Sequence, residues 1–434
     1  MKYIQFFDSH SDYEEYISGE TQDVASVSVC IAENDIHYNV KPEHDYSKDY
    51  FTIKSLEDNN TIYLSGPTGI ITNISASTDN GETWVEYVPK TTGSGTTIAT
   101  LAKDEKLLVK GNNLRYSNGA NNIQFKASGE FDVQGNIMSL VSGDSFAEAD
   151  ELSGMFAFRG LFDGCNEIIS AKNLILPAMI INEECYSSMF KNCKNLTSAP
   201  ELPALSLAPY CYVSMFSGCK KLVECPSVLP GVSLANGCYQ NMFFDCKDMT
   251  KTPELPATEL EESCYSHMFD LCIGLLTPPE LPATNLAPYC YEGMFFSCSG
   301  LTVAPELPAT ELQEWCYKDM FTQCNSLIET PELPATELAT GCYSGMFAEA
   351  SGLTTVTELP APILVVKCYD QMFNYCTNIN YVKCLAINVS AQDSTRQWLQ
   401  SVSNSGTFVK DPSMTSWPSG ANGIPTGWNV EDAS

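Results

Sequence analysis

Apolar residues recur along the middle of the chain with a period of about 26 residues. The recurring unit reads CYxxMFxxCxxLxxxPELPATxLxxx. Its nine copies, counted from the Met-Phe pair or from Leu161-Phe162 in the first copy, start at residues 161, 189, 215, 242, 268, 294, 320, 346 and 372. In CYxxMFxxC the apolar positions are 0, 1, 4, 5 and 8, which lie on one face of a helix. The pattern therefore predicts a two-turn helix in each unit.

The second half of the unit has a leucine-like residue three positions after the second cysteine, followed by Pro-Glu-Leu-Pro. Prolines remove donors from a strand ladder, so we expect only a very short parallel strand per unit. A unit of this size buries its apolar face only against neighbours, which predicts a stacked solenoid. Strands stack at about 4.8 Å and helices at about 8–10 Å, so we expect curvature with the helices on the convex side.

The cysteine pairs favour packing over cross-links. Positions 0 and 8 of one helix are about 12 Å apart along its axis, and cysteines on adjacent helices would be about 8–10 Å apart, both too far for a disulfide. Ala350 and Ala157 replace one cysteine each in two copies, which a small buried hydrophobe tolerates. Occasional disulfides and metal ligation remain as alternatives, although the 19 cysteines include no CxxC pair and the four histidines are scattered.

The flanking segments have different patterns. Residues 1–45 are expected to form a small α+β module, with strands at KYIQFF and VASVSVCIA, a short helix beginning at Asp8 or Ser9, and a linker that begins at His37. Residues 46–148 are expected to form a β-sandwich-like domain with a hairpin at Asp79-Asn80-Gly81. Residues 149–388 then form the solenoid and residues 389–434 its C-terminal cap, with Trp398, Trp417 and Trp428. The expected fold is an α+β or α/β solenoid of nine leucine-rich-like repeats behind these two modules.

The net negative charge of the chain argues against nucleic acid and anionic membranes as partners. The 434 residues carry a formal net charge of -30, which repels nucleic acid and anionic membranes. No run approaches eighteen apolar residues, so we expect no membrane insertion. The N-terminus MKYIQFFDSHSDYEEY shows no secretory signal, which favours synthesis in the cytosol, and many reduced thiols fit that compartment.

Candidate chemistry is sparse. The sequence contains no P-loop, GxSxG, HExxH or GxGxxG motif, and His267 falls at a variable position expected to be exposed. We expect no cofactor and no metal. Six glutamates occupy the same position in different copies of the repeat, and Ser227 interrupts their row. They are Glu201, Glu254, Glu280, Glu306, Glu332 and Glu358. Stacked rungs would place these acids about 5 Å apart, either as a stripe that binds cations or a partner, or as a solvated edge that keeps the solenoid soluble. We favour the solvated edge.

The repeat resembles a known family. CYxxMFxxCxxLTxAPELPAT resembles the BspA-like leucine-rich repeats of surface proteins from Bacteroides-group gut bacteria, with related chains encoded by their phages. ISASTDNGETWVEY, GEFDVQGNIMSLVSGDSF and SGTFVKDPSMTSWPSGANGIPTGW extend the likeness over residues 50–434. FFDSHSDYEEYISGE resembles a leader module of phage-encoded fibre or surface proteins. The resemblance implies adhesion or recognition and supplies no catalytic residues.

These observations predict a non-enzymatic phage virion fibre or appendage, made in the host cytoplasm and displayed on the virion surface. The N-terminal module would dock to other virion proteins, and the solenoid would contact a host surface glycan or protein. Closed symmetry makes a homo-oligomer the expected state. The alternatives are a bacterial cell-surface adhesin of the BspA-like type and, from another class, a polysaccharide-cleaving enzyme that uses a pair of its 53 acids.

Overall fold

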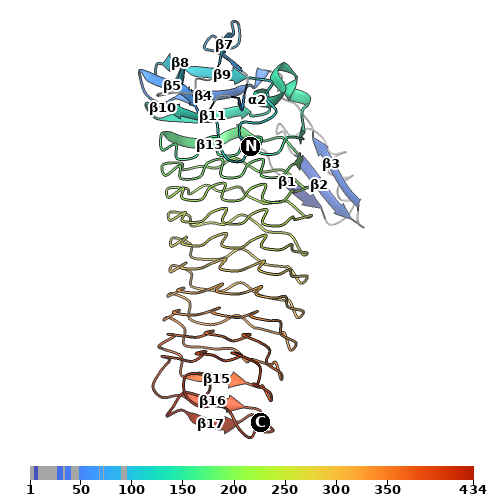
Figure 1. The fold of residues 1–434 in the computed structure, drawn as a ribbon, viewed down its shortest axis with the longest axis vertical. Helices are drawn as coiled ribbons and strands as arrows, with labels where there is room; N and C mark the ends of the chain where they lie inside the picture. Colours follow the sequence, from blue (N-terminus) through green and yellow to red (C-terminus); the bar gives the residue numbers. More distant parts are fainter. Residues whose placement is uncertain are drawn as a thin grey trace.

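A computed structural model describes residues 4–7, 27–32, 35–40, 48–67, 69–71, 73–88 and 95–434, the first three as strands only. The structure is mostly sheet, with very few helices, and most of its length is a stack of similar coils (Figure 1). No helix in these described ranges is long and apolar enough to span a membrane.

The N-terminal sheet has the order β1-β2-β3, formed by β1 (Ile4–Phe7), β2 (Val27–Ala32) and β3 (Asp35–Val40). β1 is parallel to β2, and β2 is antiparallel to β3. The two predicted strands are confirmed. The predicted linker at His37 is wrong at its start, because this residue pairs with Cys30 across β2 and β3. The predicted helix at Asp8 lies outside the described residues.

Residues 48–148 form two sheets. Their elements are β4 (Phe51–Ser55), β5 (Asn60–Ser65), β6 (Ile74–Ser77), β7 (Val85–Tyr87), β8 (Thr96–Leu101), β9 (Lys106–Lys110), β10 (Gln124–Ala127), β11 (Phe131–Asn136), α2 (Ser139–Ser142) and the 3-10 helix η2 (Gly143–Glu148). A three-stranded sheet has the order β10-β5-β8, and β11, β4, β9, β6 and β7 belong to a six-stranded sheet. Phe51 of one sheet packs on Phe125 of the other with ring centroids 5.4 Å apart, so the sheets share a core.

The predicted hairpin is confirmed by the antiparallel pairing of β6 with β7. Its turn is held by the Asp79 carboxylate, which accepts hydrogen bonds from the Ser77 hydroxyl at 2.6 Å and the Thr83 amide at 2.9 Å. These bonds lower the pKa of Asp79 to about 2. The Trp84 indole donates to the Gly81 carbonyl and closes the turn from the other side.

The helix predicted for CYxxMFxxC is wrong, because the segment is a run of turns. In one copy, the amides of Ser187, Met189 and Lys191 donate to the carbonyl three residues earlier. The alternate amides of Tyr186, Ser188 and Phe190 donate instead to the next coil, at 2.9 Å each. Every fourth residue has a left-handed backbone, such as Ser188 at φ 55° and Asn192 at φ 59°. The true period is therefore four residues, and every second amide is satisfied between coils.

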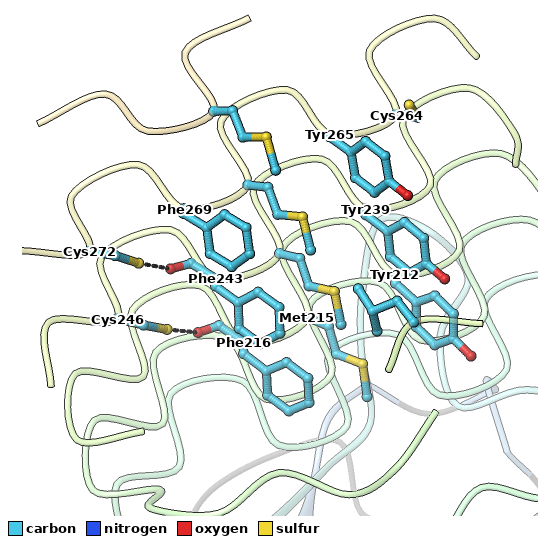
Figure 2. Packing of buried hydrophobic residues seen from close by; sticks show 14 of the residues in the cluster. Tyr212, Met215, Phe216, Tyr239, Phe243, Cys246, Cys264, Tyr265, Phe269 and Cys272 are labelled. Carbon is cyan, nitrogen blue, oxygen red and sulfur yellow. Dashed lines mark hydrogen bonds between the residues drawn. The ribbon is translucent and has the colours of Figure 1, made fainter. Parts of the chain in front are cut away.

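Stacked coils place equivalent side chains in rows (Figure 2). Phenylalanine rings from Phe162 to Phe373 lie 5.2–5.7 Å apart, and tyrosine rings from Tyr186 to Tyr369 lie 5.5–6.1 Å apart. Both rows are buried, as are the row of methionines between them and the two rows of cysteines. The expected curvature from helices 8–10 Å apart is wrong, because without helices this side of the coil stacks almost as closely as strands do.

The other sides of the coil contain the expected short parallel rungs. Isolated bridges join Ser170, Ser198 and Glu224 in successive coils, and Glu329 pairs with Thr355 in the same way. The leucine-like position is fully buried in every copy from Leu196 to Ile379. The prediction of short parallel strands in a stacked repeat is confirmed.

Both ends of the stack are continuous with their neighbours. At the N-terminal end β13 (Ile168–Ile175) pairs with β11, so the first coil joins the six-stranded sheet, while β12 (Glu151–Leu152) pairs with β14 (Ile180–Ile181). At the other end β15 (Tyr381–Cys384), β16 (Thr407–Lys410) and β17 (Asn429–Asp432) form a parallel sheet. One hydrophobic core runs from Phe51 to Trp428.

The stack of coils continues into residues 389–434, which the sequence assigned to the C-terminal cap. The amides of Tyr369 and Phe373 donate to the carbonyls of Ser394 and Trp398, the bonds that earlier copies make to Cys and Met. Left-handed residues recur at 393, 397 and 401. A further coil therefore forms with different side chains, and Trp398 stacks on Tyr369 at 6.0 Å to extend the tyrosine row.

Candidate functional site

The second cysteine row has a hydrogen bond that its sequence did not indicate. In seven coils its thiol donates to the phenylalanine carbonyl of the preceding coil at 2.9–3.2 Å, with Cys246 to Phe216 and Cys272 to Phe243 drawn in Figure 2. A disulfide would remove this donor. Burial also raises the pKa of thiols in this row, such as Cys298, so the thiolate is disfavoured. The row therefore links coils while its sulfurs stay reduced.

The eighteen cysteines from Cys165 to Cys384 are free thiols, in agreement with the packing interpretation. The first row, from Cys185 to Cys368, is buried beside the tyrosines and makes few thiol hydrogen bonds. Only Cys225 among the described cysteines is less than fully buried. The predicted separation of 8–10 Å between cysteines on adjacent helices is wrong. The prediction that these cysteines pack and do not form disulfides still holds, because the thiols have backbone or apolar neighbours.

The acidic row lies on the surface as expected. Its six members, Glu201, Glu254, Glu280, Glu306, Glu332 and Glu358, are all exposed. Two of them have partners in the next coil: Glu201 accepts from the Ser227 hydroxyl at 2.9 Å, and Glu358 pairs with Lys383 at 2.5 Å. Within the part of the chain that the structure describes, no group of three or more His, Cys, Asp or Glu residues is arranged to hold a metal ion. The row contributes charge to one edge of the rod.

His267 is not simply exposed, as its variable position suggested. Its imidazole Nδ1 lies 3.1 Å from the Asp270 carboxylate, and its side chain is only 33% exposed. A Cβ at Gly293 in the next coil would lie 2.4 Å from the imidazole, so the glycine provides the space. The hydrogen bond to Asp270 raises the pKa of His267, and burial opposes this shift. The pair joins two turns of one coil.

Neighbouring outward positions add ion pairs between coils. Lys318 lies 2.7 Å from Glu292, and Arg396 forms two hydrogen bonds with the nearly buried Asp370, at 2.8 and 2.6 Å. Equivalent positions meet in adjacent coils here, which the predicted helix did not indicate. Gly, Asn and Asp tolerate a left-handed backbone and occupy some of these positions, such as Gly237, Asn241 and Asp245. Ser263, His267 and Leu271 occupy them in the next coil, so residue type is only a weak signal for this geometry.

Comparisons with family models, with curated proteins and with solved structures find no match to this chain.

Proposed function

We propose that this protein is a non-enzymatic recognition protein, a phage virion fibre or appendage that holds its solenoid toward the host cell surface. The observation that carries the proposal is the uninterrupted rod. Phenylalanine rows, tyrosine rows and hydrogen bonds between coils continue from the first coil to the last. Eight steps from Phe162 to Phe373 at about 4.8 Å extend the rod by about 40 Å. A rod joined through a shared core to a β region suits a role in reaching and contacting a surface.

The resemblance of the repeat to BspA-like leucine-rich repeats supports recognition as the activity. The cysteine rows support assembly in a reducing compartment, because a chain with this many thiols would form wrong disulfides if it folded in an oxidising one. This favours a virion component over an exported adhesin. Under this proposal the N-terminal module docks to other virion proteins, and the protein forms a homo-oligomer.

Fractionation tests the proposal. An antibody to the repeat array would follow the native protein through a density gradient of lysate and culture supernatant. We expect it to band with DNA-containing particles and to block attachment. Sedimentation with cell envelopes in the absence of particles would support the adhesin instead. Loss of polysaccharide chain length on incubation with the purified protein would support an enzyme.

A further inference from the structure

A groove lies at the end of the rod opposite the β region. It is shallow and open, with a volume of about 420 Å³, and lies between residues 387–390 of one coil and residues 414–418 of the following segment. The first segment follows β15 and the second follows β16 in the sequence, and these strands lie at the end of the stack opposite the β region (Figure 1). The end farthest from the β region is the part of a projecting rod that meets a surface first.

The lining of the groove is uncharged and mixed in character. Ile387, Val389, Met414 and Pro418 provide apolar surface, and the other lining residues are Trp417 with one amide and two hydroxyl side chains, Asn388, Ser390 and Ser416. None of the eight is ionisable, although the chain has a net charge of -30. A charged ligand would find no opposite charge in this lining. A neutral ligand with both C–H faces and hydroxyl groups matches it.

Trp417 is the last ring of the aromatic stack. One face packs on Trp398 with centroids 5.9 Å apart, and Phe408 meets the ring edge-on at 5.0 Å. The other two tryptophans of this region donate their indole N–H groups to backbone carbonyls, Trp398 to Gly423 at 3.0 Å and Trp428 to Ser403 at 2.8 Å.

The Trp417 indole N–H is buried without an acceptor among the described residues. The ring is therefore positioned by its packing on Trp398 and Phe408 and not by a hydrogen bond. An aromatic ring beside neutral hydrogen-bonding groups is the arrangement that suits a sugar ring, whose C–H face packs on the indole while its hydroxyls bond to amides and hydroxyls.

From this geometry we infer that the groove at Trp417 binds a neutral carbohydrate. The inference rests on the proposed function only for the source of that carbohydrate, the host cell surface. The chemistry of the lining assigns the class of ligand, and the place of the groove at the end of the rod assigns its role in first contact.

Two variants and one control test the site in the full-length protein. Trp417→Ala removes the aromatic surface. Ser416→Glu places a negative charge in the groove at an exposed residue that makes no side-chain hydrogen bond in the described structure. Ser233→Glu is the matched control, because it adds the same charge at an exposed rung position outside the groove, where the next coil already has Glu259. Circular dichroism and thermal melting check that each variant is folded.

The probes are soluble neutral oligosaccharides of glucose, galactose, mannose and N-acetylhexosamines, with sialylated and sulfated oligosaccharides as the charged comparison. We expect the wild type to bind a neutral probe, followed by tryptophan fluorescence and calorimetry. Ser416→Glu and Trp417→Ala should weaken that binding roughly tenfold or more, and Ser233→Glu should not change it. Absence of binding to every neutral probe, or equal binding by Ser416→Glu, would overturn the inference.

Binding to host cells separates this inference from the proposed function. We expect periodate treatment of the cells to abolish binding of the wild type. If protease treatment abolishes it and periodate does not, the groove takes a peptide and the carbohydrate assignment is wrong. If Ser416→Glu binds cells as the wild type does, recognition stands but the groove is not its site. If the protein binds neutral oligosaccharides but never bands with particles, the virion proposal fails and the groove assignment survives.

Discussion

Reduced thiols in the second cysteine row should contribute measurably to stability, and Cys298→Ala tests this. Cys298 is fully buried, and its thiol donates to the Phe269 carbonyl at 3.0 Å. Loss of the buried sulfur costs about 1 kcal/mol, and loss of the hydrogen bond costs about 0.5–1.5 kcal/mol. The carbonyl keeps a second donor, the Cys272 amide at 3.1 Å, so it is not left unsatisfied. We therefore expect a destabilisation of about 1.5–2.5 kcal/mol.

The chain also provides the reverse experiment. Ala350 occupies the same position in a coil that lacks the second cysteine, and it is fully buried. The Phe321 carbonyl in the preceding coil accepts from the Cys324 amide, with no thiol donor. Ala350→Cys restores the row between Cys324 and Cys376, so we expect a gain of about 1 kcal/mol.

The assay is urea unfolding in the presence of a reductant, combined with hydrogen exchange of amides in the altered coil. Exchange is needed because stacked repeats open locally and do not always unfold in one step. Cys298→Ser separates packing from hydrogen bonding, since a hydroxyl retains the donor without the sulfur. If Cys298→Ser costs as much as Cys298→Ala and Ala350→Cys brings no gain, the thiol hydrogen bond is not a source of stability.

Three further predictions follow from individual coils. Phe295→Ala should cost about 3–5 kcal/mol, since the ring is buried between two stacked neighbours, and hydrogen exchange should rise in the coil around it and not in the β sheets. Because the pKa of His267 is raised by its hydrogen bond to Asp270, its contribution to stability should be complete below the ordinary pKa of 6.5 and be lost as pH rises through the higher folded value. NMR titration should show this elevated pKa, and His267→Gln should flatten that part of the stability profile; an imidazole that titrates at or below 6.5 would contradict it. Of the described thiols, Cys225 should react first with a thiol reagent in the native protein, although slowly, because burial raises its pKa to about 12. Cys225→Ser should remove this first reaction. Simultaneous reaction of several thiols would refute the burial argument.

The sequence by itself determined the repeat, its buried positions and its solenoid class. Apolar side chains at fixed spacing have to be buried, and a 26-residue unit buries them only against copies of itself. The hairpin at Asp79 and the strand pattern around it were also readable, because turn residues and alternation are local signals. The reduced state of the cysteines followed from their replacement by alanine in two copies.

The backbone conformation of the repeat was decided by the tertiary structure. Positions 0, 1, 4, 5 and 8 fall on one side both at a period of 3.6 and at a period of 4, and nine residues are too few to separate the two. The turn conformation is favoured because the next coil in the stack supplies a carbonyl acceptor to every second amide, as Cys211 does for the amide of Tyr186. A lone repeat has no such acceptors, so propensity alone favours the helix.

The extent of the stack and the groove at its end also required the fold. The coil around Trp398 lacks the Cys-Tyr and Met-Phe signature. It forms nevertheless, because its carbonyls accept hydrogen bonds from amides of the preceding coil. The groove joins Asn388 to Trp417, which are almost thirty residues apart, across a coil whose sequence lacks the repeat signature. No periodicity marks these positions, so their proximity depends on the path of the chain after the last regular coil, and local sequence patterns do not encode that path.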